Sequence, residues 1–286
     1  MFVVCVLART EAGNFSWRVV TVETGETTFS LAVTRPHRKE RTMLVVPCHG
    51  MHGVRIFSFG GVIYDKPIPD TEEGKEPEGF DIEYIDVDRG ELVSVATKLP
   101  YHMCRGAAGL IAPGTAVVCG GVTDTGKMCI EIDLDTFATR RLPDMIEYRR
   151  DHAVVLYRGA IVAVGGFQIW GTDGRSECEQ LVLGADKWTA MAAPTGHYPT
   201  CSAVVVDELL YVYCRYSMEV YDGTTWNRIV RSNSVPPVFI FEYKGALAAM
   251  GAGSGPVETF DPATATWTEL HAPKFQCRIC NVFGSF

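Results

Sequence analysis

The sequence lacks the features that would direct the protein to a membrane or to nucleic acid. None of the apolar runs in its 286 residues approaches the roughly 18 residues needed for a membrane-spanning helix. Lys and Arg number 26 against 34 Asp and Glu, which gives a net charge of −8. A net acidic domain is repelled by a phosphate backbone. We therefore expect neither a membrane nor a nucleic acid as the partner.

The N-terminal segment also lacks the marks of a signal peptide. Met1 to Leu7 is apolar but short, with neither a basic region nor a small-residue cleavage site. We interpret this segment as a β-strand.

The ten cysteines lack the paired spacing in loops that marks a disulfide framework. Cys119 and Cys214 lie inside apolar runs, which is typical of buried small hydrophobic residues. A chain of this length does not need covalent cross-links, so we expect reduced thiols and a cytosolic or nuclear protein, with the cytoplasm as our prediction. Cys277 and Cys280 form a lone CxxC. In a strand their side chains point to opposite faces, so we predict no metal or redox site there.

What the sequence does contain is an internal repeat. Three apolar runs end in a glycine pair, at Gly60–Gly61, Gly120–Gly121 and Gly165–Gly166, and two further runs hold the same place near Cys214 and Gly251. An apolar run and a tight turn precede each of them. A variable loop follows, then a strand that ends in an acidic or turn residue, then a last strand. Each unit therefore predicts four short strands, here lettered a to d, with turns between them.

The repeat has the length and composition of a propeller blade. Its period is roughly 40 to 60 residues, and a short link that contains proline joins strand d of one unit to strand a of the next. Trp188, Trp226 and Trp267 open strand d in three units. We expect them to pack against the neighbouring blade as core residues. The glycine pairs are expected where the backbone needs a positive φ or a very close approach.

These residues resemble the kelch-repeat family. Residues 148–166 carry the arginine and histidine lead and the double glycine, and residues 246–270 carry the turn followed by tryptophan. The resemblance implies an all-β fold, a β-propeller of kelch type, and it covers nearly the whole chain. The internal units fall at about 42–97, 102–142, 150–192, 200–231 and 237–271.

The two ends of the chain together make one further unit. Residues 1–33 supply strands b, c and d, and residues 276–284 supply a strand a. Their pairing would close the ring and leave no open edge. We therefore predict six blades in a single domain that spans residues 1–286, with no helical module before it.

Several surface features are candidates for function. The longest b–c loop, residues 65–79, holds six acidic residues and two lysines, a net charge of 2 − 6 = −4. Long loops in compact domains are often recognition elements, although this one also fits a solvated insertion. The loop at 167–177 carries Trp170, an anchor of the kind that interfaces prefer, or a side chain folded back on its blade. The single basic cluster is typical of a solvated loop; it comprises Arg35, His37, Arg38, Lys39 and Arg41.

Arginines recur where strand a begins: Arg105, Arg149, Arg150 and Arg278. In kelch domains that bind acidic peptides, arginines at such positions line the mouth of the central pocket. The resemblance therefore makes these four residues, with Trp170, the candidate partner-binding residues, and Arg105 and Arg150 the foremost of them. A structural role that ties strand a to the preceding link is the competing interpretation.

Enzymatic alternatives find less support in the sequence. Glu147 and Asp151 match the first half of the iron motif ExxxDxxxH, but Val155 stands where the histidine should be. Cys48, His49 and His52 place a thiol and two imidazoles within five residues, but lack a fourth ligand nearby. We predict no catalytic residue, no metal and no cofactor.

We predict a monomeric module that binds another protein or peptide through the face that carries the b–c and d–a loops. The alternative is a small-ligand enzyme on the same fold, with a sugar of the sialic-acid type as the substrate of an epimerase. Titratable side chains converging on a closed pocket would favour the enzyme.

Overall fold

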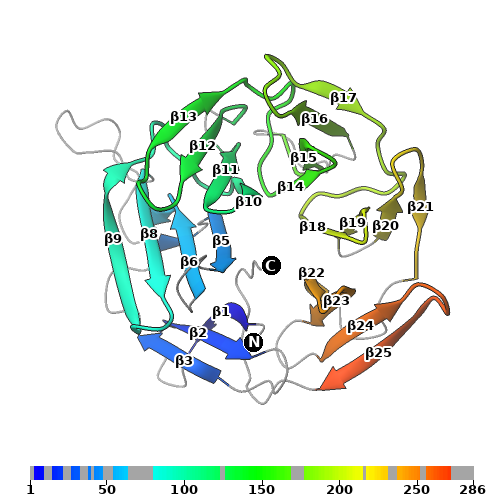
Figure 1. Ribbon diagram of the computed structural model, residues 1–286, viewed down its shortest axis with the longest axis horizontal. Coiled ribbons are helices and arrows are strands. Elements are labelled where there is room, and N and C mark those ends of the chain that lie inside the picture. The colour runs from blue at the N-terminus through cyan, green and yellow to red at the C-terminus, as the bar shows by residue number, and fades with distance from the viewer. Residues whose placement is uncertain are drawn as a thin grey trace.

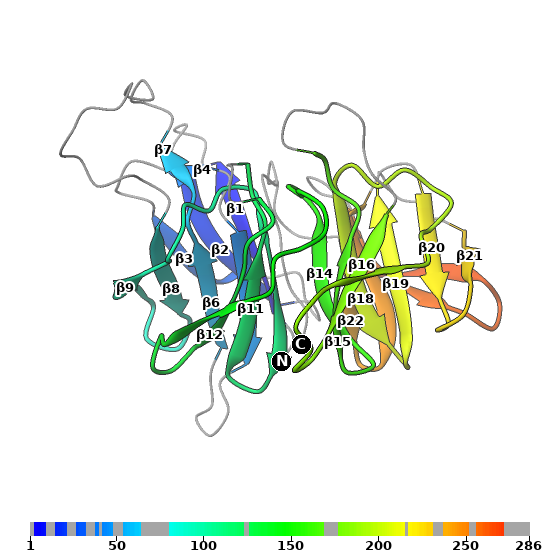
Figure 2. The same cartoon turned by 90° about the horizontal axis from the view of Figure 1, so that it is seen from above.

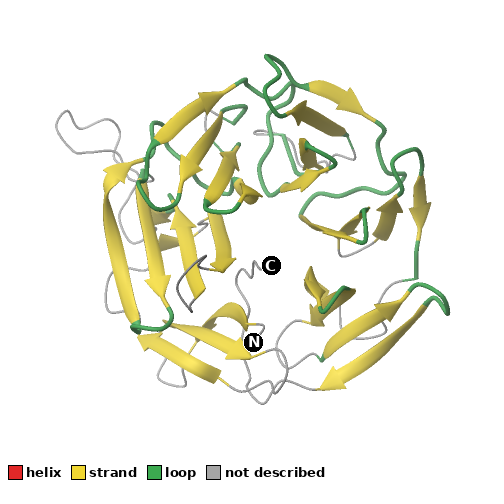
Figure 3. Ribbon diagram, viewed as in Figure 1, coloured by secondary structure: helices red, strands yellow, loops and turns green. Residues whose placement is uncertain are grey.

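The chain forms a ring of β-sheets in the computed structural model (Figure 1). The structure describes residues 3–9, 15–21, 27–32, 38–39, 42–47, 54–63, 80–122, 126–168, 177–214, 217–230, 237–251 and 256–271. Strands and loops account for all of these ranges (Figure 3), and no helix long and apolar enough to cross a membrane occurs within them.

The sheets follow one another around the ring in chain order. The first has three antiparallel strands, β1 (Val3–Arg9), β2 (Phe15–Thr21) and β3 (Thr27–Ala32). The next has four, β5 (Thr42–Pro47), β6 (Val54–Phe59), β8 (Asp81–Asp86) and β9 (Glu91–Lys98). A two-stranded sheet, β4 (Arg38–Lys39) with β7 (Val62–Ile63), lies at one face of the ring (Figure 2).

Four more four-stranded antiparallel sheets complete the described ring. They are β10 (Ala107–Ala112), β11 (Thr115–Cys119), β12 (Cys129–Asp133), β13 (Thr139–Leu142); β14 (Ala153–Tyr157), β15 (Ala160–Val164), β16 (Cys178–Val182), β17 (Thr189–Met191); β18 (Cys201–Val206), β19 (Leu209–Cys214), β20 (Ser217–Tyr221), β21 (Trp226–Arg228); and β22 (Pro237–Tyr243), β23 (Ala246–Gly251), β24 (Val257–Asp261), β25 (Thr266–His271).

The prediction of an all-β, propeller-like chain built from four-stranded antiparallel units is confirmed in these five sheets. Each predicted internal unit contains one of them, with the strands in the order a, b, c, d. The three N-terminal strands also pair as predicted, as a sheet of three. The predicted closing strand, residues 276–284, lies outside the described residues, so the count of six blades stays a prediction.

The glycine pairs join each sheet to the next. The second glycine donates its N–H to a carbonyl in the following d–a link, over 2.7–2.8 Å; the bonds are Gly61 to Met103, Gly121 to Arg149 and Gly166 to Tyr198. Gly165 has φ +64°, and a Cβ on it would lie 2.6 Å from the carbonyl oxygen of Tyr198. The two backbones therefore approach too closely for any side chain. Met103, Arg149 and Tyr198 hold equivalent positions in successive links.

A glutamate recurs on strand c, opposite the residue two places before the glycine pair or its equivalent. The pairs are Ser58 with Glu83, Ala163 with Glu179, Val212 with Glu219 and Ala249 with Glu258. Glu219 is fully buried and accepts hydrogen bonds from the backbone N–H groups of Thr195 and Gly196, over 2.8 and 2.7 Å. Buried backbone donors need such partners, so this carboxylate holds the d–a link that leads into its own blade.

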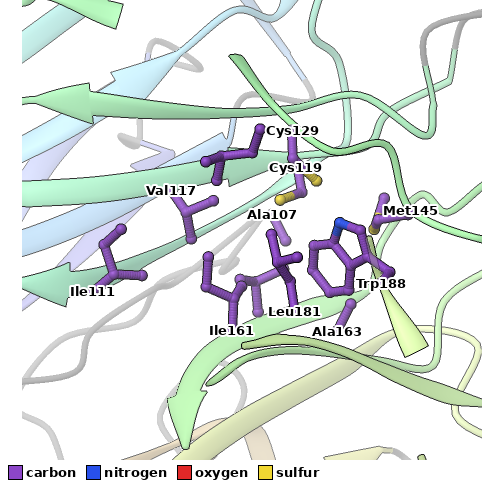
Figure 4. Packing of buried hydrophobic residues seen from close by; sticks show 12 residues of the cluster. Ala107, Ile111, Val117, Cys119, Cys129, Met145, Ile161, Ala163, Leu181 and Trp188 are labelled. Atoms are coloured by element: carbon purple, nitrogen blue, oxygen red, sulfur yellow. The ribbon is translucent and has the colours of Figure 1, made fainter. Parts of the chain in front are cut away.

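The tryptophans of strand d pack against the preceding blade, as predicted. Trp188 is buried among Cys119, Cys129 and Met145, which come from the neighbouring sheet and link (Figure 4). Each indole N–H also reaches a carbonyl at the exit of the preceding blade, over 2.7–2.9 Å; the bonds are Trp188 to Pro143, Trp226 to Ala192 and Trp267 to Val230. The indole therefore supplies both buried area and a directional contact between blades.

The close approach at Gly165 can be separated from the backbone strain of a positive φ. Gly184 has φ +87° and nothing within 4 Å of a Cβ, so Gly184→Ala introduces strain alone. We expect Gly165→Ala to lower the free energy of unfolding by about 1–3 kcal/mol more than Gly184→Ala does. Urea unfolding of the two variants measures this difference. Equal losses would mean that the glycine pair serves only the backbone conformation.

Candidate functional site

Arg105 and Asp151 occupy equivalent positions at the ends of two successive d–a links. Each lies two residues after the carbonyl that receives the glycine N–H, and each has a positive φ, 58° and 55°. The backbone N–H of Asp151 donates to the carbonyl of Arg105 over 2.8 Å, and Cys201 N–H donates to the carbonyl of Asp151 over 3.3 Å. Three consecutive links are thus joined where the innermost strands β10, β14 and β18 begin.

The side chains at this point form a cluster around one carboxylate. Arg105 donates from Nε to Asp151 Oδ1 over 2.8 Å, and its Nη2 donates to Oδ2. Arg150 Nη1 donates to the same Oδ2 over 3.1 Å. The side chains of Arg105, Arg150 and Asp151 are 31%, 16% and 15% exposed. Two guanidinium groups therefore grip one partly exposed carboxylate, and the cluster has a net charge of +1.

Arg150 is held from its other side by the b–c loop of its own blade. Its guanidinium lies 4.6 Å from the centre of the Phe167 ring, a cation–π contact. The two backbones also exchange hydrogen bonds, Arg150 N–H to Phe167 O over 3.1 Å and the reverse over 2.9 Å. We call Arg105, Arg150, Asp151 and Phe167 the mouth cluster.

The structure brings together the two foremost predicted residues, Arg105 and Arg150, through a residue to which sequence reasoning gave no such role. Asp151 drew attention only as part of an incomplete iron motif, and Phe167 only as the first residue of a loop. The signal for Asp151 was present in the repeat, because alignment of the d–a links places it opposite Arg105. Phe167 directly follows a glycine pair, which gave no comparable signal.

Arg149 lies in the interior, and its contacts are those of a structural residue. Its side chain is 1% exposed and donates from Nε to Glu179 Oε1 over 2.8 Å. Its Nη1 donates to the carbonyls of Gly165 and Glu177, over 2.7 and 2.8 Å. Glu179 in turn accepts the backbone N–H of Ile146 over 2.6 Å. In this arrangement the guanidinium does not reach the surface, so Arg149 does not belong to the mouth cluster.

The neighbouring blade fills the same two positions with apolar side chains. Met103 is equivalent to Arg149, and Ile130 is equivalent to Glu179, because Ile130 pairs with the residue two places before Gly120. Met103 and Ile130 are buried in one hydrophobic cluster. The repeat therefore uses a buried ion pair in one blade and an apolar pair in the next.

The other predicted site residues, Trp170 and Arg278, lie outside the described residues, as do the acidic loop 65–79 and the Cys48, His49 and His52 turn. The root of the acidic loop is described. Strand β7 precedes it and pairs with β4, so that Arg38 lies opposite Ile63 and Lys39 opposite Val62. Part of the predicted basic loop is therefore a short strand that runs beside the root of the acidic loop.

The described residues offer no assembled metal site. Across these ranges no three His, Cys, Asp or Glu side chains gather as metal ligands would. Six cysteines whose side chains are described there form no disulfide with one another, and all but Cys201 are buried; they are Cys104, Cys119, Cys129, Cys178, Cys201 and Cys214. Burial raises the pKa of the Cys178 thiol to about 12, so at neutral pH it is an uncharged core residue.

His152 directly follows the mouth cluster and is 4% exposed. Its ring lies against Gly120, where a Cβ would be 2.6 Å from its Cε1 atom. Neither ring nitrogen has a hydrogen-bond partner within the described residues. Burial, and secondarily the charge of Arg149, lower the pKa of His152 to about 3. His152 is therefore neutral in the folded protein and acts as a wedge between two blades.

Comparison with known proteins adds a fold relation. No protein-family model matches the sequence, and no curated protein matches it. Among solved structures, the chain is similar to that of YjhT, with a TM-score of 0.67 and 12% sequence identity. The alignment covers 90% of this chain and 91% of YjhT. At this identity the similarity concerns the fold alone.

The ion pair at positions 149 and 179 can be replaced by the apolar pair that the neighbouring blade has at the equivalent positions. Arg149→Met leaves a buried carboxylate without its guanidinium, and we expect a loss of about 3–5 kcal/mol in unfolding free energy. The double variant Arg149→Met/Glu179→Ile copies the neighbouring blade and should recover about 2 kcal/mol or more of that loss. Chemical denaturation of both variants measures the coupling. A double variant no more stable than Arg149→Met would contradict this account.

His152 makes the stability of the protein depend on pH. Its pKa is about 3 when folded and near 6.5 when unfolded, so between these values the unfolded chain binds a proton that the folded chain does not. Stability is therefore lost as the pH falls below 6.5, by up to about 1.4 kcal/mol per pH unit. Denaturation at pH 7.5, 6.5 and 5.0 should show this slope in the wild type. His152→Cys, which copies Cys201 at the equivalent position, should lack it; equal slopes would rule out His152 as the cause.

Proposed function

We propose that the chain is a six-bladed β-propeller of kelch type that binds another protein or peptide through the mouth cluster. Five four-stranded sheets and one three-stranded sheet support six blades. Among the described strands, the innermost ones pack side by side in the order β5, β10, β14, β18, β22, whereas β1 packs closely against neither β5 nor β22. That pattern supports a further innermost strand from residues 276–284.

The grip of Arg105 and Arg150 on one carboxylate is the observation that carries the binding proposal. Planar guanidinium groups bind carboxylates through paired, charge-assisted hydrogen bonds. Three N–H donors from two links already converge on the oxygens of Asp151. A peptide segment that carries negative charge is the natural complement of such a group. Trp170, in the loop that begins at Phe167, would add a rigid apolar anchor.

The alternative function is that of an enzyme on a small acidic ligand, for which a sugar acid is the candidate. The mouth cluster supports it to the same extent, because an arginine pair recognises a carboxylate on any carrier. We further propose that the protein is a monomer of the cytoplasm. The six cysteines whose side chains are described form no disulfide with one another, which supports a reducing compartment.

The binding proposal predicts that substitutions in the mouth cluster or at Trp170 weaken partner binding, whereas a substitution elsewhere does not. Arg105→Ala and Arg150→Ala should each weaken capture of the partner by about tenfold or more, the scale of a lost hydrogen bond to a charged group. Trp170→Ala should also weaken it. Arg140→Ala is the matched control, because Arg140 lies on the outer strand β13 and pairs with Glu131. Quantitative affinity capture from native extract, with a melting curve for each variant, measures the effect.

Two outcomes would count against the proposal. If all variants recover the same proteins in the same amounts, this face is not the binding surface. If no protein is captured but native mass spectrometry finds a small acid bound to the wild type and lost in Arg105→Ala, the enzymatic alternative takes its place.

A further inference from the structure

The mouth cluster already contains a carboxylate, and this bears on which ligands can enter it. Asp151 accepts from both Arg105 and Arg150, and is adjacent to Arg150 in the chain. An intramolecular group competes at a high effective concentration, in the millimolar range or above. A ligand must therefore displace Asp151, or bind beside it against its charge.

A ligand with a single carboxylate gains little from that exchange. It replaces one carboxylate by another on the same three donors, and it loses its own translational freedom on binding. A doubly charged group changes the balance, because with Asp151 displaced it meets two guanidinium charges with two of its own. Two arginines also present enough donors for the three oxygens of a phosphate.

We infer that the mouth cluster selects groups that carry two negative charges, of which a phosphate monoester is the most compact, over single carboxylates. Asp151 acts as the built-in competitor that sets this threshold. The inference rests on the proposed binding function and names the chemistry of the partner: a phosphorylated segment rather than a merely acidic one.

The backbone allows Asp151 to leave the arginines without disturbing the links. Its N–H and C=O groups are held independently, by Arg105 and Cys201, over 2.8 and 3.3 Å. Its side chain is 15% exposed, so part of it reaches solvent. Rotation about the side-chain bonds is therefore enough to vacate the donors.

Asp151→Asn removes the negative charge of residue 151 with little structural change, so that the effect of the charge can be measured. Asparagine has the same shape, and it is one of the residues that tolerate a φ of 55° best. The probes are phenyl phosphate and benzoate, which share a ring and differ in charge at pH 8. Asp144→Asn is the matched control, because Asp144 lies on the same link, pairs with Arg141 and is outside the cluster.

In calorimetric titration we expect the wild-type protein to bind phenyl phosphate at least about tenfold more tightly than benzoate. The reason is that displacing Asp151 costs a charged hydrogen bond, which is worth about this factor in affinity and which only the doubly charged ligand offsets. Asp151→Asn should bind benzoate about tenfold more tightly than the wild type does, so that the preference shrinks. Asp144→Asn should behave as the wild type. Melting curves confirm that each variant is folded.

The outcomes separate this inference from the proposed function. If the wild type binds both probes equally well, and Arg105→Ala abolishes both, the clamp binds anions but Asp151 sets no threshold, and only the inference falls. If Asp151→Asn binds benzoate more weakly than the wild type, Asp151 orders the arginines instead of competing for them, and the inference again falls. If no folded variant binds either probe, the proposed function falls with it.

Discussion

The hydrogen bond from the second glycine of each pair to the next link is the contact on which the rest of the ring depends. It brings the end of strand b of one blade against the backbone that leads into the next blade, so closely that a Cβ at Gly165 or Gly120 would meet a carbonyl oxygen at 2.6 or 2.5 Å. This backbone contact fixes where each link lies, whatever its side chains are. The residues two places further along, Arg105 and Asp151, are then set side by side at the start of neighbouring strands. The position of the mouth cluster is therefore a consequence of how the blades are joined.

Once the backbone is fixed, side chains must fill the interior beside each d–a link, and no buried polar group may be left without a partner. The blades solve this in two ways. Glu219 and Glu179 satisfy the link N–H groups directly and bind Tyr198 and Arg149 at the same time. In the blade formed by β10 to β13 and the link that leads into it, Met103 and Ile130 pack together as apolar side chains instead. Either pair of side chains satisfies its surroundings, whereas a mixed pair, with one charged and one apolar member, would bury a charge without a partner. The two positions are therefore coupled, although they lie on different strands.

The repeat made most of the fold predictable, since glycine pairs, strand-d tryptophans and link prolines recur at fixed places. The bounds of the five internal units follow from them closely. The side chains of the mouth were less predictable. Arg149 and Arg150 are neighbours of the same type, but the side chain of Arg149 is 1% exposed, whereas that of Arg150 is 16% exposed and belongs to the mouth cluster. Composition does not reveal which arginine is buried, because burial depends on the register of strand c, which places Glu179 beside Arg149. Alignment of Arg149 with Met103 and Tyr198, both buried, carries that information.

The charged residues of the mouth cluster are not a general feature of the repeat. Thr200 holds the place of Asp151 in the next link, two residues after Tyr198, and it carries no charge. The link nevertheless makes the same bond from Gly166, and the blade that follows has the same four strands. A charged residue at this position is thus not required to join two blades. Arg105 and Asp151 also adopt a positive φ without being glycine, a strain of about 1–3 kcal/mol that is usually retained at sites with a task. Charge and strain therefore coincide in two adjacent links, at a position where the joining of the blades requires no charge.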